Sequence, residues 1–411
     1  MRVLIISWEF TPHVVGGLGK HAAELVPELG GISVVDEPLY IDVVTTRFAG
    51  GDKIEQLNQH TTIHRVDVPA VDPLDLYNSI VDNNSPLTEY ARRLGTLHRY
   101  DIIHVHDWLT GKAGITLKHE WAVPLIVTIH ATERGRQQGH LATTLSYQID
   151  RMEWQTCFEA WRVIVCSNYM TEELQNYFEL PLDKINVIPN GINHRHLKTS
   201  SPGEIAQARH LYGRDSERLL FFVGRISYEK GVQVLLKAMP QILNQYPKTR
   251  LLVAGKNSGT MLPLAQKLRI EEAVTFLGFI SDSERDRIYQ IADAAVFPSL
   301  YEPFGIVALE AMVLGCNVIT SNVGGLGEVV RHERTGLTVF PNDPDSIAWA
   351  VDRLFSQPDA AGLRRTWARQ EVITHYNWPT IARLTGDLYQ IVKEERRVTA
   401  WYPRMEHLTM S

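Results

Sequence analysis

Short runs of valine, isoleucine and other apolar residues recur along the chain, and they constrain its fold more than any other feature. In the first half these runs are "RVLIIS" (2–7), "IDVVTT" (41–46), "DIIHVH" (101–106), "PLIVTIH" (124–130) and "RVIVCS" (162–167). Near-continuous apolar runs are typical of strands buried on both faces, as in a parallel sheet. Helical patterns such as "KHAAELVPEL" separate them, so the first half predicts an α/β sheet with helices on both faces.

The second half of the chain restarts the same alternation. Its predicted strands are "RLLFFVGRI" (218–226), "RLLVAGK" (250–256), "VTFLGFI" (274–280), "AAVFPS" (294–299) and "NVIT" (317–320). The polar stretch "HRHLKTSSPGEIAQAR" (194–209) predicts a linker between the halves. At 411 residues the chain suits two domains, and two doubly wound α/β domains are the simplest fold.

The last predicted element is a helix, "WPTIARLTGDLYQIVKEERR". Its periodicity predicts one apolar face, formed by Ile381, Leu384, Leu388 and Ile391. The tail "KEERRVTAWYPR" mixes basic and aromatic residues, a pattern that also marks peripheral membrane contact, but we expect it to pack on the first domain.

Composition excludes several classes of protein. The net charge, 41 minus 47 or −6, gives no basic field for nucleic acid. No apolar run approaches the roughly 18 residues that a membrane span needs. Three cysteines without paired or metal-type spacing fit a reducing compartment, so we expect a cytoplasmic protein with core thiols. The stripe "EWQTCFEAWRV" (153–163) likewise predicts ordinary core.

Two glutamates flank a predicted helix start in "SLYEPFGIVALEAM" (299–312), directly after a strand. A helix that begins near Phe304–Gly305 offers unpaired N–H groups and a dipole that attract an anion. Glu310 would lie about 7 Å further along the helix axis. Carboxylates repel phosphate but accept hydrogen bonds from hydroxyls. The pair therefore predicts a nucleotide sugar, with Glu310 at the ribose and Glu302 at the sugar.

Positive charge for the diphosphate would come from "GRISYEKG" (224–231), after the first strand of the second half. Arg225 could grip the diphosphate with its planar fork and Lys230 could act as a point charge. Fixed cations stabilise a leaving diphosphate without a metal. Such a pair alone is more often an exposed surface feature, but combined with the two glutamates it favours donor binding.

Glycines follow the first strand in "VVGGLGKH" (14–21). Gly16, Gly17 and Gly19 allow positive φ and close approach of the backbone to a ligand. The pattern is not G-x-G-x-x-G, and by itself it is weak evidence. The pair Gly324–Gly325 at a later strand end is either a tight turn or a further ligand contact.

Together, "VVGGLG", "GRISYEKG" and the E-x7-E of "YEPFGIVALE" resemble the retaining GT-B glycosyltransferases, in the large family that holds glycogen synthase-like enzymes, sucrose-type synthases and mannosyltransferases. The resemblance implies two Rossmann-like domains that face a cleft, with an acceptor-binding domain at 1–195 and a donor-binding domain at 196–376. It also implies that a C-terminal segment, 377–411, returns as a helix to the first domain.

The resemblance also assigns roles residue by residue. It implies a catalytic group of His130, Arg225, Lys230 and Glu302. It places at the donor the residues Gly16, Gly17, Arg225, Lys230, Glu302, Phe304, Gly305, Ile306 and Glu310. Asp107 matches an acidic position near the acceptor, and "HATERGRQQGH" (130–140) adds Arg134, Arg136 and His140, which suit a glucan or an anionic acceptor.

The chain differs in two ways from the starch-synthase-type enzymes, and two of its short motifs resemble metal sites. Starch-synthase-type enzymes have a lysine where this chain has Val15, and they lack the second glutamate, so their ADP-glucose preference does not carry over. In "HVHD" (104–107), His104 and His106 share a strand face, but a zinc site needs three or four convergent ligands. "DPD" (343–345) suits a helix cap better than a metal clamp. We expect no metal and no cofactor.

The sequence thus predicts a metal-independent enzyme that moves a hexosyl group, in the first place glucosyl, from ADP- or UDP-glucose to an acceptor hydroxyl with retention. The acceptor would be an α-glucan, as in a glycogen synthase. The alternatives are a small or lipid-linked acceptor, and a non-catalytic sensor of sugar nucleotides. The base, the sugar, the acceptor and the oligomeric state do not follow from the residues.

Overall fold

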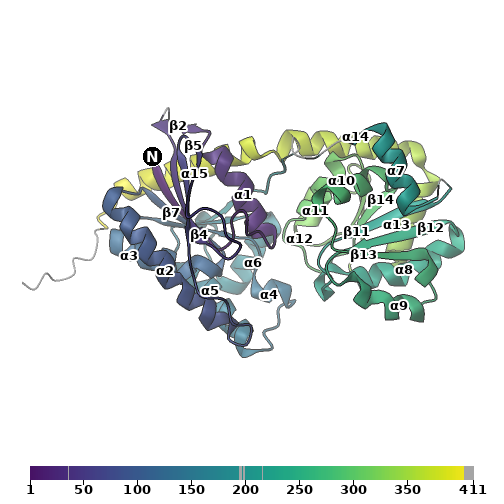
Figure 1. Ribbon diagram of the computed structural model, residues 1–411, viewed down its shortest axis with the longest axis horizontal. Helices are drawn as coiled ribbons and strands as arrows, with labels where there is room; N and C mark the ends of the chain where they lie inside the picture. Colours follow the sequence, from purple (N-terminus) through teal and green to yellow (C-terminus); the bar gives the residue numbers. More distant parts are fainter. Residues whose placement is uncertain (36, 194–196, 198–199, 215, 402–411) are drawn as a thin grey trace, which may run out of the picture. The chain divides into compact units, whose positions relative to one another are not determined.

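The computed structural model describes residues 1–35, 37–193, 197, 200–214 and 216–401. The chain divides into two compact units. Unit 1 comprises Met1–Gly191 together with the chain from Trp378 onward, and unit 2 comprises Ile192–Asn377. The sequence placed these divisions at 195–196 and 376–377. Each unit is a parallel sheet with helices on both faces, as expected from the two series of apolar runs (Figure 1).

Unit 1 is built on an eight-stranded sheet in the order β10-β9-β8-β7-β1-β4-β6-β5, parallel except for β5. Its strands are β1 (Arg2–Ser7), β4 (Tyr40–Thr46), β5 (Ile54–Asn58), β6 (Thr61–Val66), β7 (Ile102–His106), β8 (Leu125–Ile129), β9 (Arg162–Val165) and β10 (Ile185–Val187). Every residue of β7 and β8 is buried, which explains their unbroken apolar sequence. The sequence reading missed the hairpin of β5 and β6, in which polar residues alternate with apolar ones. A separate two-stranded pair is formed by β2 (Ser33–Val34) and β3 (Glu37–Pro38).

The helices of unit 1 complete its two outer layers. They are α1 (Gly17–Leu29), α2 (Leu76–Leu97), α3 (Gly111–Trp121), α4 (Glu133–Arg136), α5 (Thr144–Glu159), α6 (Asn168–Phe178) and α15 (Trp378–Arg397). Residues of α1 and α15 share one core with β1, β4 and β8. In Figure 1 the yellow α15 lies along the first unit's sheet although it comes last in the chain.

The face that α15 buries differs in part from the predicted one. Ile381 and Leu388 are buried as expected, but Leu384 and Ile391 are 43% and 51% exposed. The buried stripe instead includes Thr385 and Tyr389. Both bury polar groups that have partners: the Thr385 hydroxyl donates to the Ile381 carbonyl, and the Tyr389 hydroxyl bonds to His104 Nδ1 at 2.6 Å. In the tail beyond α15, Trp401 stacks on Trp161 of unit 1, as expected, and residues 402–411 lie outside the described part of the chain.

Unit 2 is built on a six-stranded parallel sheet in the order β13-β12-β11-β14-β15-β16. Its strands are β11 (Arg218–Val223), β12 (Thr249–Ala254), β13 (Val274–Gly278), β14 (Ala294–Phe297), β15 (Asn317–Ser321) and β16 (Leu337–Val339). Its helices are α7 (Pro202–Tyr212), α8 (Val232–Gln245), α9 (Leu262–Lys267), α10 (Asp282–Ile291), α11 (Ile306–Val313), α12 (Gly324–Val329), α13 (Pro344–Ser356) and α14 (Pro358–His375).

The stretch predicted as a linker is helical in its second part, as α7. Pro202 occupies the first turn of that helix, and Ser201 and Glu204 form a capping box at its start. The first part of the predicted linker, 194–199, lies mostly outside the described residues. Over the described parts of the chain, no helix is both long and apolar enough to cross a membrane.

Candidate active site

Three loops meet at the carboxyl ends of neighbouring strands in unit 2. They follow β11, β14 and β15, which are adjacent in the sheet. The backbone N–H of Leu300 donates to the Glu229 carbonyl at 2.7 Å, and that of Gly325 donates to the Glu302 carbonyl at 2.9 Å. These bonds fix the three loops to one another at the edge where ligands of such sheets bind.

Lys230 and Glu302 meet in this group of loops. Lys230 Nζ lies 2.6 Å from a carboxylate oxygen of Glu302, and the two side chains are 20% and 12% exposed. Gly231 makes this approach possible, because its φ is +70° and a Cβ there would lie 1.8 Å from the Pro298 carbonyl oxygen. The two residues are 72 positions apart in sequence, and the structure brings them together as an ion pair.

Arg225 stands apart from that pair. Its guanidinium is 70% exposed and lies 3.3 Å from Glu229 in the same loop. An exposed ion pair of this kind contributes little to stability, so the guanidinium can exchange its partner at low cost. The structure therefore holds Lys230 in place and leaves Arg225 extended toward solvent.

Helix α11 begins where the sequence predicted. Gly305 precedes it with φ +101°, and a Cβ there would lie 2.5 Å from Leu326. The free N–H groups of the first turn follow directly, beside the loop that carries Glu302. Phe304 is buried against Tyr376, so only its backbone could meet a ligand, while Ile306 is half-buried.

Glu310 lies in the second turn of α11 and is only 2% exposed. Its carboxylate is 3.5 Å from a guanidinium nitrogen of Arg285, which α10 supplies. Arg285 also pairs with Asp286 at 2.8 Å. Sequence reasoning missed Arg285; the only signal was a basic residue in the charged run "DSERDR" that begins α10. The buried cation compensates for the burial of Glu310.

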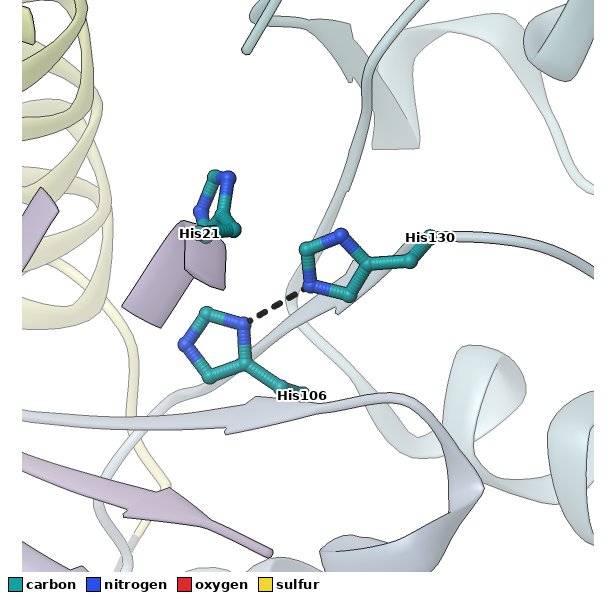
Figure 2. A group of neighbouring side chains, drawn as sticks. All are labelled: His21, His106 and His130. Carbon is teal, nitrogen blue, oxygen red and sulfur yellow. Dashed lines mark hydrogen bonds between the residues drawn. The ribbon is translucent and has the colours of Figure 1, made fainter. Parts of the chain in front are cut away.

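In unit 1 the matching strand ends carry histidines. His106 ends β7 and His130 follows β8, while His21 stands on α1, the helix after β1; these three strands are neighbours. Figure 2 shows the three rings gathered together, with a hydrogen bond of 3.2 Å between His106 Nδ1 and His130 Nε2. The ring centres of His21 and His130 are 4.7 Å apart.

His21 is the member that the sequence reading did not include. Its only signal was its place in the first turns of the helix after the glycine loop. Its Nδ1 lies 2.7 Å from the Asn190 side-chain oxygen and so carries the proton, which leaves Nε2 as an acceptor. This Nε2 is buried and has no hydrogen-bond partner among the described residues.

Burial keeps these rings uncharged. It lowers the pKa of His21 to about 4, and it lowers the pKa values of His106 and His130 well below the usual 6.5. His104, on the same strand face as His106, is fully buried between Tyr389 and Thr128, which identifies it as a core histidine. The cluster therefore offers neutral imidazoles, which donate and accept hydrogen bonds and do not attract phosphate.

The three rings also form a group that could hold a metal ion. One ligand atom from each of His21, His106 and His130 lies within 4.8 Å of the others, and imidazole suits transition metals. The bond between His106 and His130 already accounts for their proximity. The absence of a metal stays a prediction.

Asp107 has an internal role. Its carboxylate is 6% exposed and accepts the backbone N–H of His130 at 2.7 Å, and burial raises its pKa to about 6. Asp107 also has φ +52°, which turns the chain sharply after β7. It therefore positions the His130 backbone, and its place near the acceptor stays a prediction.

The predicted acceptor arginines face carboxylates. Arg134 makes two bonds to Asp150, at 2.7 and 3.0 Å. Arg136 lies 3.6 Å from Glu133 and 3.9 Å from the buried Glu153. His140 is exposed nearby in sequence, after α4. This balance of charge weakens the attraction of the segment for an anionic acceptor.

The glycine loop before α1 departs from expectation in its backbone. Gly16 precedes α1 with φ −149°, Gly17 and Gly19 lie inside α1, and none of the three adopts the positive φ that glycine allows; their contact with a donor stays a prediction. A Cβ at Gly16 or Gly17 would meet nothing within 4 Å, which leaves room for a ligand. The Glu9 carboxylate accepts the N–H groups of Val15 and Gly16 at 2.8 and 3.1 Å and holds the loop.

Three other predictions concern residues outside these loops. Asp343 caps α13 by accepting the N–H groups of Asp345 and Ser346, as expected for a cap. The predicted core stripe on α5 is wrong in part, because Trp154 and Phe158 are 41% and 59% exposed and stack on each other. The three cysteines are free and buried, as expected.

Comparison with known proteins agrees with this division into two units. The model of the family "Glycosyltransferase Family 4" matches residues 15–196, and that of "Glycosyl transferases group 1" matches residues 207–371. The chain is 37% identical to an uncharacterized glycosyltransferase, MJ1607, of Methanocaldococcus jannaschii, over 96% of this chain and 99% of the relative. It is 34% identical to a glycogen synthase of Mycobacterium tuberculosis, over 99% of both.

Among solved structures, sucrose-phosphate synthase from Thermosynechococcus elongatus superimposes with a TM-score of 0.81 at 26% identity, over 96% of this chain and 99% of that one. Fold, full-length relatives and family models agree, and the chain belongs to the GT-B glycosyltransferases.

Proposed function

We propose that this glycosyltransferase moves a hexosyl group, in the first place glucosyl, from a nucleoside diphosphate sugar to an acceptor hydroxyl with retention. The observation that carries the proposal is the contact of Lys230 with Glu302 beside the start of α11. It puts a cation for phosphate, a carboxylate for sugar hydroxyls and a helix N-terminus in one group of loops in unit 2.

Each part of that group has a separate task in donor binding. The first N–H groups of α11 and the Lys230 ammonium hold the diphosphate, and the exposed Arg225 turns from Glu229 onto it. Glu302, released from Lys230, accepts hydrogen bonds from sugar hydroxyls. Glu310 serves the ribose, at a site that Arg285 keeps electrically balanced.

The chemical step follows from where charge develops. As the bond between the sugar and the diphosphate breaks, negative charge grows on the leaving oxygen, and the fixed cations stabilise it more than they stabilise the ground state. We assign no carboxylate nucleophile, because Glu302 is engaged with hydroxyls. The leaving phosphate itself takes the proton of the incoming hydroxyl on the same face of the sugar. Neutral His130 orients the donor sugar by hydrogen bonding.

The acceptor we propose is an α-glucan. Two observations support this choice: a full-length relative is named a glycogen synthase, and the arginines of the acceptor segment face carboxylates. The rival is a phosphorylated sugar acceptor. It is favoured by the name of the sucrose-phosphate synthase neighbour.

The test measures release of nucleoside diphosphate from ADP-glucose, UDP-glucose and GDP-mannose, each with and without glycogen. We expect release that depends on glycogen, from one of the glucose donors, with no loss on addition of EDTA. Proton NMR of the product should show an α linkage. Release with fructose 6-phosphate but not with glycogen would establish the rival acceptor. Binding of donor without any turnover would identify a sensor.

A further inference from the structure

One cavity of unit 2 has the lining of a sugar-binding site. It has a volume of about 590 Å³ and lies beyond the carboxyl ends of β15 and β16, against α13. Its floor and walls include Trp349 of α13, His332, and Phe340, which directly follows β16. A cavity of this size is in the range that binds small molecules. None of its lining residues belongs to the loops that carry Lys230 and Glu302.

The aromatic part of the cavity is open and ordered. The rings of Trp349 and His332 stack with an angle of 16° and a centre-to-centre distance of 6.0 Å. Trp349 is 46% exposed and Phe340 is 73% exposed. His332 is fixed in place because its Nδ1 accepts the Thr338 backbone N–H at 3.0 Å. Large rings left in solvent around a hollow mark a binding surface more often than a packing defect.

The polar part of the cavity suits hydroxyl groups. Asp345 is exposed at the rim, and Asn322 and Thr338 add further donors and acceptors. The Nδ1 of His332 is an acceptor, so its neutral ring presents an N–H at Nε2. Among the described residues that line the cavity there are two aspartates and neither lysine nor arginine. Phosphate would be repelled here, unlike at the loops of Lys230 and Arg225.

A pyranose ring meets both requirements at once. Its axial C–H groups form an apolar face that packs against an aromatic ring, and its hydroxyls, which lie around the edge, bond to carboxylates and amides. We propose that this cavity, named here the Trp349 cavity, binds a neutral oligosaccharide and anchors the glycan acceptor outside the reacting centre. The choice of a sugar rests on the proposed function; the lining alone excludes anionic ligands.

The experiment compares single variants of the whole chain. The probe is maltoheptaose, titrated by isothermal calorimetry, and glycogen cast into native gels serves as a second probe. Trp349→Ala should weaken binding of maltoheptaose about tenfold and reduce retardation in the gel. Phe340→Ala should do the same to a smaller extent. Trp367→Ala is the matched control, because this tryptophan of α14 is 48% exposed, and it should bind like wild type.

A measurement of transfer separates this proposal from the proposed function. In Trp349→Ala we expect a higher KM for glycogen with kcat and the KM for the donor unchanged. Equal retardation of wild type and Trp349→Ala by glycogen would contradict oligosaccharide binding in the Trp349 cavity. A wild type that transfers glucose but is not retarded would contradict it as well. If the wild type transfers no glucose and Trp349→Ala still removes its retardation by glycogen, the Trp349 cavity binds oligosaccharide but the proposed function is wrong.

A cationic peptide is the other ligand that an acidic, aromatic cavity could take. Oligolysine should give no heat of binding in the same titration. A response to oligolysine together with none to maltoheptaose would also overturn the proposal. Circular dichroism of each variant confirms that a loss of binding is not a loss of folding.

Discussion

In unit 1, the end of β7, the loop after β8 and helix α1 bring uncharged imidazoles together, whereas in unit 2 the loops after β11 and β14 bring a lysine and a glutamate together. Both sets lie at the carboxyl ends of adjacent parallel strands. The same topology thus supplies two chemistries. Neutral rings suit hydroxyl-rich ligands and need burial to stay neutral, while fixed charges suit a diphosphate and need a partner while no ligand is bound.

The first prediction tests the contrast between the two units by removing the cation of unit 2. Lys230→Ala should lower kcat about a thousandfold, because stabilisation of the leaving diphosphate is lost in the transition state. Steady-state release of nucleoside diphosphate measures this effect. The control is Lys237→Ala, an exposed lysine on the following helix α8, which should behave like wild type. A kcat for Lys230→Ala within tenfold of wild type, with folding intact, would remove Lys230 from the mechanism.

The second prediction concerns the buried charges of unit 2. Arg285→Ala should destabilise unit 2 by about 3 kcal/mol, because Glu310 stays buried without this cation. Hydrogen exchange of peptides from α11 measures the loss locally. Arg287→Ala, two residues further on the same helix, removes a guanidinium that bonds to Ser283, and should cost much less. Equal protection of α11 in both variants would show that Glu310 does not depend on Arg285.

The third prediction is that acid destabilises unit 1 more than unit 2. The folded pKa of His21 is lowered to about 4, so the unfolded chain binds its proton first as pH falls below 6.5. Stability from His21 is complete above pH 6.5 and is lost as pH falls through about 4. His104, His106 and His130 act in the same sense because burial lowers their pKa values too.

Two buried carboxyls of unit 1 oppose this trend. Burial raises the pKa values of Asp107 and Glu153, so their contribution is present at low pH and is lost as pH rises through the folded value. Four histidines against two carboxyls leave unit 1 less stable at pH 5 than at pH 7.5. Hydrogen exchange, corrected for intrinsic rates, should show this loss in β7 and β8 and a smaller one in β11 and β14. An equal loss in both sheets would contradict the contrast between the units.

How much of this could be predicted from the sequence depends on the range of the interaction. The buried strands and the start of α11 follow from local patterns, namely continuous apolar runs and the glycine before "IVALE". The cluster of three histidines does not, because His21 joins His106 and His130 only through the order β1-β7-β8 in the sheet. For the same reason Arg285, the partner of Glu310, looked like any charge on a solvated helix. Contacts between side chains on different helices and strands leave no pattern in the sequence around either residue.

The smallest effect we predict concerns the helix by which the end of the chain joins unit 1. Tyr389 on α15 bonds to His104 Nδ1 at 2.6 Å, and both side chains are fully buried. Tyr389→Phe keeps the ring and leaves one imidazole nitrogen without its partner, which should cost about 1 kcal/mol. Because Tyr389 is not among the residues assigned to the donor or the acceptor, kcat should stay at the wild-type value while the thermal midpoint falls. Hydrogen exchange should place the loss in α15 and β7, and a loss in unit 2 instead would mean that α15 does not stabilise unit 1 through this bond.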